Sequence, residues 1–245
     1  MPRYDFRTSR LYVEAPLSAG AMISLGREQA NHLLNVLRLE HGDPVLLFNG
    51  RDGEWSAHVS AAGKRNSALT VEQRLREQPA ASDLHFLFAP LKHARLDYMV
   101  QKAVEMGASL LQPVITQHTQ VARVNTERMR ANVVEAAQQC GVLALADVIE
   151  PAPFARVLDA LVDERLLIFC DEEAEVKDPI TALQGAPAHK GMPVLIGPEG
   201  GFSEEERKLL LRRSNVLRLS LGPRILRADT AAVAALAVVQ AVLGD

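Results

Sequence analysis

The sequence predicts an α/β protein with a mostly parallel sheet, preceded by a small and mainly β module. Three features of the 245 residues support this fold class. Apolar runs separated by turn dipeptides come first, a polar run containing Pro79 follows, and strands then alternate with helices. Such alternation is typical of parallel sheets that helices cover on both faces. We therefore expect a module at 1–76, a linker at 77–83 and a larger domain at 84–245.

Residues 1–76 contain short strands and one helix. Strands are expected at Pro44–Phe48, Glu54–Val59 and Ser67–Val71, and the Asn-Gly and Asp-Gly pairs between the first two are strong hairpin signals. A helix is expected over Arg27–Leu37. Its apolar residues recur at helical spacing and are Ala30, Leu33, Leu34 and Leu37.

Strands and helices alternate in residues 84–245. The expected strands are 84–89, 110–116, 166–170, 193–196 and 216–221, and the expected helices are 97–107, 126–141, 203–213 and 229–243. Gly107 suits a helix C-terminal cap. Ser203 and Glu206 have the spacing of a capping box, which marks a helix start.

Composition excludes several classes of protein. Hydrophobic residues make up 48% and charged residues 23%, as in ordinary globular proteins. The longest nearly apolar stretch, 231–243, is shorter than the ~20 residues that cross a bilayer, and residues 1–7 lack the apolar core of a signal peptide. Two cysteines, Cys140 and Cys170, and seven scattered histidines show no metal-ligand spacing. We expect a cytoplasmic protein with no membrane partner and no metal.

The net charge of −3 does not by itself favour a nucleic-acid partner. Residues 151–195 hold 4 basic and 8 acidic residues, however, so the rest of the chain is nearly balanced and local basic groups can still meet phosphate. Isolated surface arginines are usually only solvated, but several basic residues cluster near the ends of expected elements. The candidate RNA contacts are Arg3, Arg7, Arg38, Lys92 and Arg95.

The loop Gly197–Gly201 directly follows a buried strand. Ligands of open α/β sheets bind at the carboxyl ends of strands, and glycines let the backbone approach a flat ligand. The loop has neither G-x-G-x-x-G spacing nor a following Gly-Lys-Ser/Thr, and Glu199 with Glu204–Glu206 would repel a polyphosphate. The pattern favours a nucleoside with a positive centre, while an ordinary strand-to-helix turn would use the same glycines.

A second loop, Leu219–Thr230, leads into the last expected helix. Its apolar residues Leu221, Ile225 and Leu226 can enclose an aromatic base, with backbone groups around Gly222 reading its edge. Two arginines, Arg224 and Arg227, lie beside them. The alternative is a loop with surface arginines whose Asp229 or Thr230 caps the helix. The helix itself is apolar nearly all round, which predicts burial in the core or against a second copy of the chain.

Five segments in a fixed order resemble one family. They are His32–Arg38 with Gly42-Asp43, Gln101–Gly107, Glu135–Cys140, Leu195–Gly201 and Leu221–Arg227. Together they are similar to the bacterial ribosomal RNA small subunit methyltransferase E family, whose members are 16S rRNA (uracil-N3)-methyltransferases of the SPOUT superfamily. The match runs from about residue 10 to the C-terminus.

The resemblance implies a PUA-like RNA-binding β-barrel in 1–76 and a SPOUT domain with a deep trefoil knot in 84–245. It also implies a homodimer through the C-terminal domain and 16S rRNA of the small subunit as partner. The implied cofactor is S-adenosyl-L-methionine. Its expected binding residues are Leu195, Ile196, Gly197, Pro198, Glu199, Gly200, Gly201, Leu221, Gly222, Ile225, Leu226 and Thr230.

Two arginines are candidate catalytic residues. Uracil N3 must lose its proton before or during attack, and Arg227 is expected to stabilise the resulting negative charge. Arg10 is a second candidate for this role, or a phosphate clamp. The sequence identifies no general base.

The chain departs from the family pattern at Val142 and Ala146, where Arg and Pro are usual, and at Asp229, where Glu is usual. The departures at Val142 and Ala146 put an expected RNA or dimer contact in doubt. The sequence leaves two other functions open: a related SPOUT enzyme acting on another RNA, and a non-catalytic RNA-binding factor for ribosome assembly.

Overall fold

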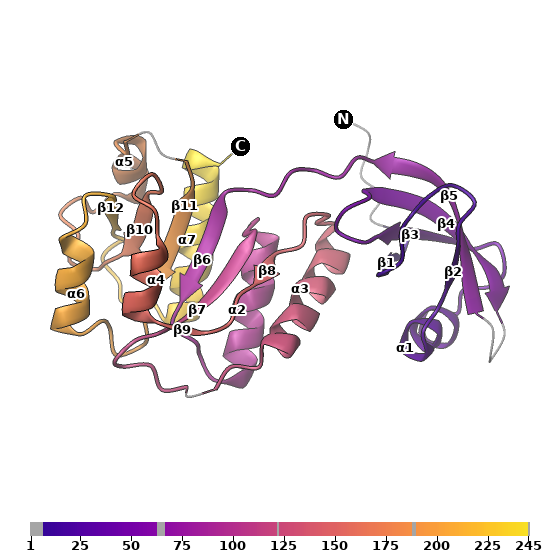
Figure 1. The fold of residues 1–245 in the computed structure, drawn as a ribbon, viewed down its shortest axis with the longest axis horizontal. Coiled ribbons are helices and arrows are strands. Elements are labelled where there is room, and N and C mark those ends of the chain that lie inside the picture. Colours follow the sequence, from indigo (N-terminus) through magenta and orange to yellow (C-terminus); the bar gives the residue numbers. More distant parts are fainter. Residues whose placement is uncertain (1–6, 63–66, 122, 188–189, 245) are drawn as a thin grey trace. The chain divides into compact units, whose positions relative to one another are not determined.

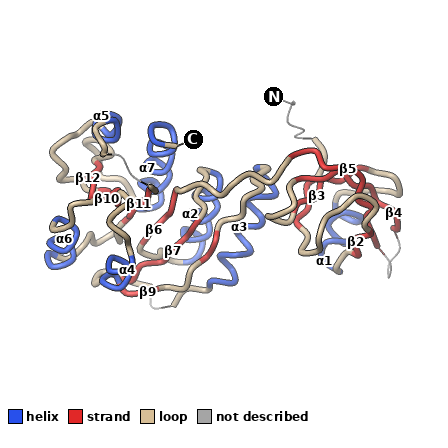
Figure 2. The backbone as a smooth tube through the Cα atoms, turned by 45° about the horizontal axis from the view of Figure 1, so that its top comes forward, coloured by secondary structure: helices blue, strands red, loops and turns tan. Residues whose placement is uncertain are grey.

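The computed structural model describes residues 7–62, 67–121, 123–187 and 190–244. The chain divides into two compact units. Unit 1 comprises Met1–Ala80 and Ala137–Ala144, and unit 2 comprises Ala81–Ala136 and Leu145–Asp245. Each unit has its own sheet, which can be followed in Figure 1 and, as red strands, in Figure 2.

Unit 1 is built on a five-stranded sheet in the order β1-β3-β4-β5-β2. Strand β1 pairs parallel with β3, and the other pairs are antiparallel. The expected hairpin strands are confirmed, although β4 and β5 are longer than predicted. The strands are β1 (Arg10–Tyr12), β2 (Met22–Ser24), β3 (Pro44–Phe48), β4 (Glu54–Ala62) and β5 (Ser67–Arg76).

One helical segment packs against this sheet, as expected. It is α1 (Arg27–Ala30) followed by η1 (Asn31–Val36), a π-helix rather than a continued α-helix. After η1 the backbone turns through Arg38, the one described non-glycine residue with positive φ, at 58°. Leu33 is the fully buried residue of the segment and joins a core with Leu47, Val59 and Leu69.

Unit 2 contains a seven-stranded sheet in which every recorded pair is parallel. The order is β12-β10-β11-β6-β7-β8, and β9 also pairs with β7. The α/β fold with a parallel sheet is therefore confirmed. The strands are β6 (Leu84–Phe88), β7 (Leu110–Ile115), β8 (Asp147–Val148), β9 (Ala152–Pro153), β10 (Leu167–Cys170), β11 (Met192–Ile196) and β12 (Val216–Leu219).

Helices cover both faces of this sheet (Figure 1). They are α2 (His93–Glu105), α3 (Thr126–Cys140), α4 (Phe154–Ala160), α5 (Pro179–Gln184), α6 (Glu204–Leu211) and α7 (Ala228–Leu243). Leu87, Phe169 and Leu195 pack with residues of α4 and α6. Their strand neighbours point to the other face because side chains alternate along a strand, and α7 packs on β11, α2 and α5.

Local signals set the ends of two helices where the sequence predicted them. Ser203 accepts a hydrogen bond from the Glu206 amide, and the Glu206 carboxylate accepts one from the Ser203 amide, so the capping box at α6 is confirmed. Gly107 follows α2 with φ of 87°, a conformation that glycine adopts without strain. Within the described residues, no helix is long and apolar enough to cross a membrane.

Candidate functional site

The carboxyl ends of three neighbouring strands in unit 2 surround one cavity of about 590 Å³. The loops after β10, β11 and β12 form its walls, and these strands are adjacent in the sheet order. This volume lies within the range of small-molecule sites, ~300–1,000 Å³. The two glycine-containing loops that the sequence singled out thus meet at a single cavity.

Most of the predicted cofactor residues line this cavity. They are Ile196, Gly197, Pro198, Glu199, Gly200, Gly201, Leu221, Gly222, Ile225 and Leu226. Two others do not. Leu195 is 1% exposed and points into the core against α4, because it alternates with Ile196 along β11. Thr230 lies on the exposed surface in the first turn of α7.

Glycine is required at two points of the wall. Gly222 has φ of 98°, and an added Cβ there would meet no protein atom within 4 Å, so it would project into open space. Gly197 differs, since an added Cβ would lie 2.6 Å from a ring carbon of Phe202. The first glycine leaves the backbone accessible beside the cavity, and the second lets Phe202 pack closely under the loop.

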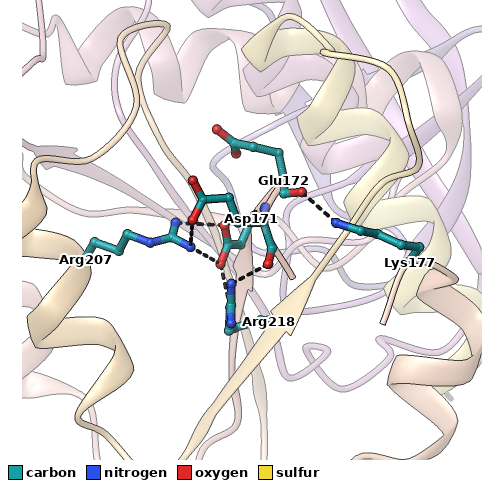
Figure 3. Close-up of polar contacts among 6 residues, drawn as sticks. Asp171, Glu172, Lys177, Arg207 and Arg218 are labelled. Carbon is teal, nitrogen blue, oxygen red and sulfur yellow. Dashed lines mark hydrogen bonds and ion pairs between the residues drawn. The ribbon is translucent and has the colours of Figure 1, made fainter. Parts of the chain in front are cut away.

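A buried carboxylate, Asp171, anchors the third loop. Figure 3 shows Arg207 and Arg218 converging on it. Its Oδ1 lies 2.8 Å from Nη1 of Arg207, and its Oδ2 lies 2.6 Å from Nε of Arg218. The Glu173 amide also donates to Oδ1, at 3.1 Å. Burial alone would raise the pKa of Asp171, but the hydrogen bonds from the two arginines hold it below its ordinary value.

Sequence reasoning missed this third loop. Asp171, Glu172 and Glu173 line the cavity with Cys170 before them. The sequence did contain a signal for this loop, because it follows the buried apolar strand at 167–170. Ligands of open α/β sheets bind at the carboxyl ends of such strands. Burial raises the pKa of the Cys170 thiol to about 12, which keeps it protonated and unreactive at neutral pH.

Arg95 bonds to residues from both glycine loops. Its Nε donates to Oδ2 of Asp229 at 2.9 Å, its Nη2 donates to Oδ1 of Asp229 at 3.3 Å, and its Nη1 donates to Glu199. The hydrogen bond from Arg95 is the main cause that lowers the pKa of Asp229. Arg95 was predicted as an RNA contact, but the structure shows it paired within unit 2.

The cavity also presents two exposed arginines, Arg224 and Arg227. Arg227 is the N-terminal cap residue of α7, and its carbonyl accepts from Ala231 at 2.8 Å. In the described part of the chain, neither guanidinium has an ion-pair partner. Both are therefore available to an anionic group at the cavity.

Arg10 belongs to unit 1, whereas the cavity is formed by residues of unit 2. Arg10 lies in unit 1 with its side chain 6% exposed, and its Nε is 2.6 Å from Oε1 of Glu54. Arg76 binds the other oxygen of Glu54 at 2.7 Å. Burial would raise the pKa of Glu54, but both arginines lower it below the ordinary value. This arrangement gives Arg10 a structural role in the sheet of unit 1.

The remaining predicted RNA contacts are at the surface. Arg7, Arg38 and Lys92 are exposed, and Lys92 directly precedes α2. Arg3 lies outside the described residues. At two of the three positions that depart from the family pattern, Val142 is half-buried and Ala146 is buried. Among the described residues, no group of His, Cys, Asp and Glu could hold a metal ion.

Comparison with known proteins links both units to one class of enzyme. The profile of an RNA methyltransferase domain matches residues 77–240, and that of an RNA methyltransferase PUA domain matches residues 25–72. The chain is 32% identical over 234 residues to ribosomal RNA small subunit methyltransferase E of Rickettsia conorii, covering 95% of each chain. It is 26% identical to the Bacillus subtilis protein of the same name, covering 98% of this chain and 96% of that one.

Solved structures give the same result. Ribosomal RNA small subunit methyltransferase E from Neisseria gonorrhoeae, bound to S-adenosyl methionine, superimposes with a TM-score of 0.83. The two chains are 27% identical, and the match covers 96% of this chain and 98% of that one. A Legionella pneumophila protein solved with the bound cofactor SAM has a TM-score of 0.81 and 30% identity, covering 96% of this chain and 98% of that one.

Proposed function

This chain belongs to the ribosomal RNA small subunit methyltransferase E family, and from that premise we propose that it methylates N3 of a specific uridine in 16S rRNA. It is an S-adenosylmethionine-dependent rRNA methyltransferase. The observation that carries the assignment is the convergence of both glycine loops on one cavity of suitable size.

The residues of the cavity fit S-adenosylmethionine. Open space beside Gly222 leaves the backbone accessible to a flat base, and Ile196, Leu221 and Leu226 supply apolar contacts. Four carboxylates and three arginines line the cavity, and this slightly negative lining suits a cationic nucleoside better than a polyphosphate. The carboxylates belong to Asp171, Glu172, Glu173 and Glu199, and the arginines are Arg207, Arg224 and Arg227. When bound, the cofactor supplies a methyl group carried on a positively charged sulfur.

Arg227 stabilises the substrate uracil in this proposal. Loss of the N3 proton to solvent water leaves a negative charge that spreads onto the two neighbouring carbonyl oxygens. A guanidinium at the cavity can donate hydrogen bonds to that charge and so stabilise it. Support comes from its position at the cap of α7 and from its lack of a carboxylate partner among the described residues.

Unit 1 binds the RNA outside the reacting base. Its PUA-like domain supports this role, and exposed Arg7 and Arg38 supply cations for phosphate. Lys92, beside the start of α2, is proposed to do the same in unit 2.

We also propose a homodimer formed through α7, and the trefoil knot that the SPOUT resemblance implies. One side of α7 is buried in unit 2 through Ala232, Ala235, Leu236 and Val239. Val238 and Val242 remain partly exposed, which leaves apolar surface for a second copy. Sedimentation equilibrium would show twice the monomer mass, and a concentration-independent monomer would contradict the dimer.

The reaction is tested on small ribosomal subunits from a strain that lacks this activity. Purified protein and S-adenosylmethionine should produce 3-methyluridine in 16S rRNA, detected by mass spectrometry of nucleosides and located by a reverse-transcription stop. A product in another RNA, or on a ribose hydroxyl, would indicate a different SPOUT activity. Calorimetric titration without any heat of cofactor binding would instead indicate a non-catalytic RNA-binding factor.

A further inference from the structure

Three charged residues of unit 2, Arg95, Glu199 and Asp229, form an ion cluster that we call the loop clamp. Glu199 lies in the loop after β11, and Asp229 lies in the first turn of α7, directly after the loop that follows β12. Arg95, in the first turn of α2, hydrogen-bonds to both carboxylates. One guanidinium thus connects two of the three loops that form the cavity walls, those after β11 and β12.

No other polar contact among the described residues joins these two loops. The carbonyls of Gly200 and Gly201 lie 3.2 and 3.1 Å from Nδ1 of His118, which comes from the segment after β7. Gly201 also donates to Pro198 at 2.9 Å, a contact within the loop itself. Beyond the strands and helices that carry the loops, the loop clamp is therefore the polar contact that links them in the described part of the chain.

The clamp has the geometry of a positioning device rather than of a stabilising core pair. The side chains of Arg95, Glu199 and Asp229 are 34%, 47% and 17% exposed. Ion pairs between side chains that are this exposed to solvent contribute little to the global stability of a protein. Their effect is local, because a guanidinium has a rigid fork that can bind a carboxylate through two nitrogens while the third nitrogen meets another partner.

We propose that Arg95 is a positioning residue that holds the two loops at the separation the methyl donor requires, before the donor enters. The inference rests on the proposed function, since it takes S-adenosylmethionine as the ligand. A cavity whose walls are already ordered binds more tightly, because less conformational entropy is lost when the ligand arrives. In this account Arg95 serves the donor site and makes no RNA contact.

Arg95→Gln tests the proposal, with Arg128→Gln as the matched control. Arg128 lies on α3 and pairs with Asp97, which is on α2 like Arg95. The distance from Nη2 of Arg128 to Oδ2 of Asp97 is 2.6 Å, and Arg128 does not line the cavity. Calorimetry with S-adenosylmethionine should show a dissociation constant raised about tenfold in Arg95→Gln and unchanged in Arg128→Gln. Amide hydrogen exchange of the donor-free protein should become faster in 197–201 and 221–227 only in Arg95→Gln.

Two further variants test whether Arg95 acts by positioning the loops or only by its positive charge. Arg95→Lys should give an intermediate dissociation constant, because one ammonium group cannot reproduce the bidentate contact with Asp229 and also reach Glu199. Asp229→Asn, which removes charge outside the cavity wall, should weaken donor binding in the same direction. The double variant Arg95→Gln/Asp229→Asn should be no weaker than Arg95→Gln alone, because both changes break one cluster.

The outcomes are distinguishable. Unchanged donor affinity and unchanged loop exchange in Arg95→Gln would overturn the inference while leaving the proposed function intact. Equal weakening by Arg128→Gln would also overturn it, since the effect would then belong to helix α2 in general. A wild-type protein that bound no S-adenosylmethionine would overturn the proposed function and this inference together.

Discussion

Asp171 is a carboxylate with no solvent exposure that nevertheless stays charged. Removing a carboxylate from water is costly, and the cost is offset here by two arginines and a backbone amide. Its lowered pKa means that the folded protein binds a proton less readily than the unfolded chain. Asp171 therefore contributes stability above its ordinary pKa of 3.8, and this contribution is lost as the pH falls toward the folded-state pKa.

Replacing Asp171 by Asn should lower the free energy of unfolding at pH 7 by about 3 kcal/mol, because Arg207 and Arg218 lose their shared partner. Urea unfolding measures the loss. The difference from wild type should stay constant between about pH 7 and pH 5 and shrink below about pH 4. A difference that did not change with pH would show that lost packing, rather than lost charge, causes the effect.

Replacing Arg227 should impair catalysis without weakening the binding of the methyl donor. Arg227→Ala should reduce methyl transfer at least about 100-fold, as removal of one transition-state hydrogen-bond donor does. Donor affinity by calorimetry should change by less than about twofold, because the loss is confined to the transition state. Arg212→Ala, at the exposed C-terminal cap of α6, is the control. Near-normal turnover in Arg227→Ala would remove this residue from the mechanism.

At the scale of elements, α6 begins where its capping box predicts, with Ser203 as its cap two residues after the loop Gly197–Gly201. Because Ser203 caps this helix, it also fixes where the chain that leaves the loop becomes helical, and Arg207 of the helix then lines the cavity. Glu206 adds a second link, since its Oε1 accepts from the Gln117 amide at 2.8 Å.

Ser203→Ala should therefore destabilise the protein by about 1 kcal/mol, the usual value for a lost cap. Ser203→Thr keeps the hydroxyl and should retain most of the stability. Chemical denaturation of both variants measures the difference. Equal stability of Ser203→Ala and wild type would mean that water replaces the cap without cost.

For the whole molecule, RNA affinity should depend on salt more steeply than donor affinity. Each cation that meets a phosphate releases about one counterion, so the slope of log affinity against log salt counts these contacts. Arg38→Ala should lower affinity for 16S rRNA and reduce that slope by about 0.7–0.9. Filter binding at several salt concentrations measures it. An unchanged slope would place Arg38 outside the RNA interface.

Local patterns in the sequence predicted the parallel sheet, the C-terminal end of α2, the start of α6 and the two glycine loops, whereas α2 begins at His93, four residues before the predicted Asp97. These features depend on neighbouring residues, such as a glycine with positive φ after α2 or a hydroxyl three residues before a glutamate. The tertiary structure alone decided which distant residues meet. It buried Arg10 against Glu54, it turned Leu195 into the core, and it added the loop of Asp171 to the cavity.

The same distinction applies to Arg95. Its type and position after a strand were visible in the sequence and suggested a phosphate contact, but its partners, Glu199 and Asp229, are 104 and 134 residues further along the chain. Charge in a sequence indicates that a group needs a partner or water. Which carboxylates lie within reach of Arg95 is determined only by the fold, which places the carboxyl ends of parallel strands at the same edge of the sheet.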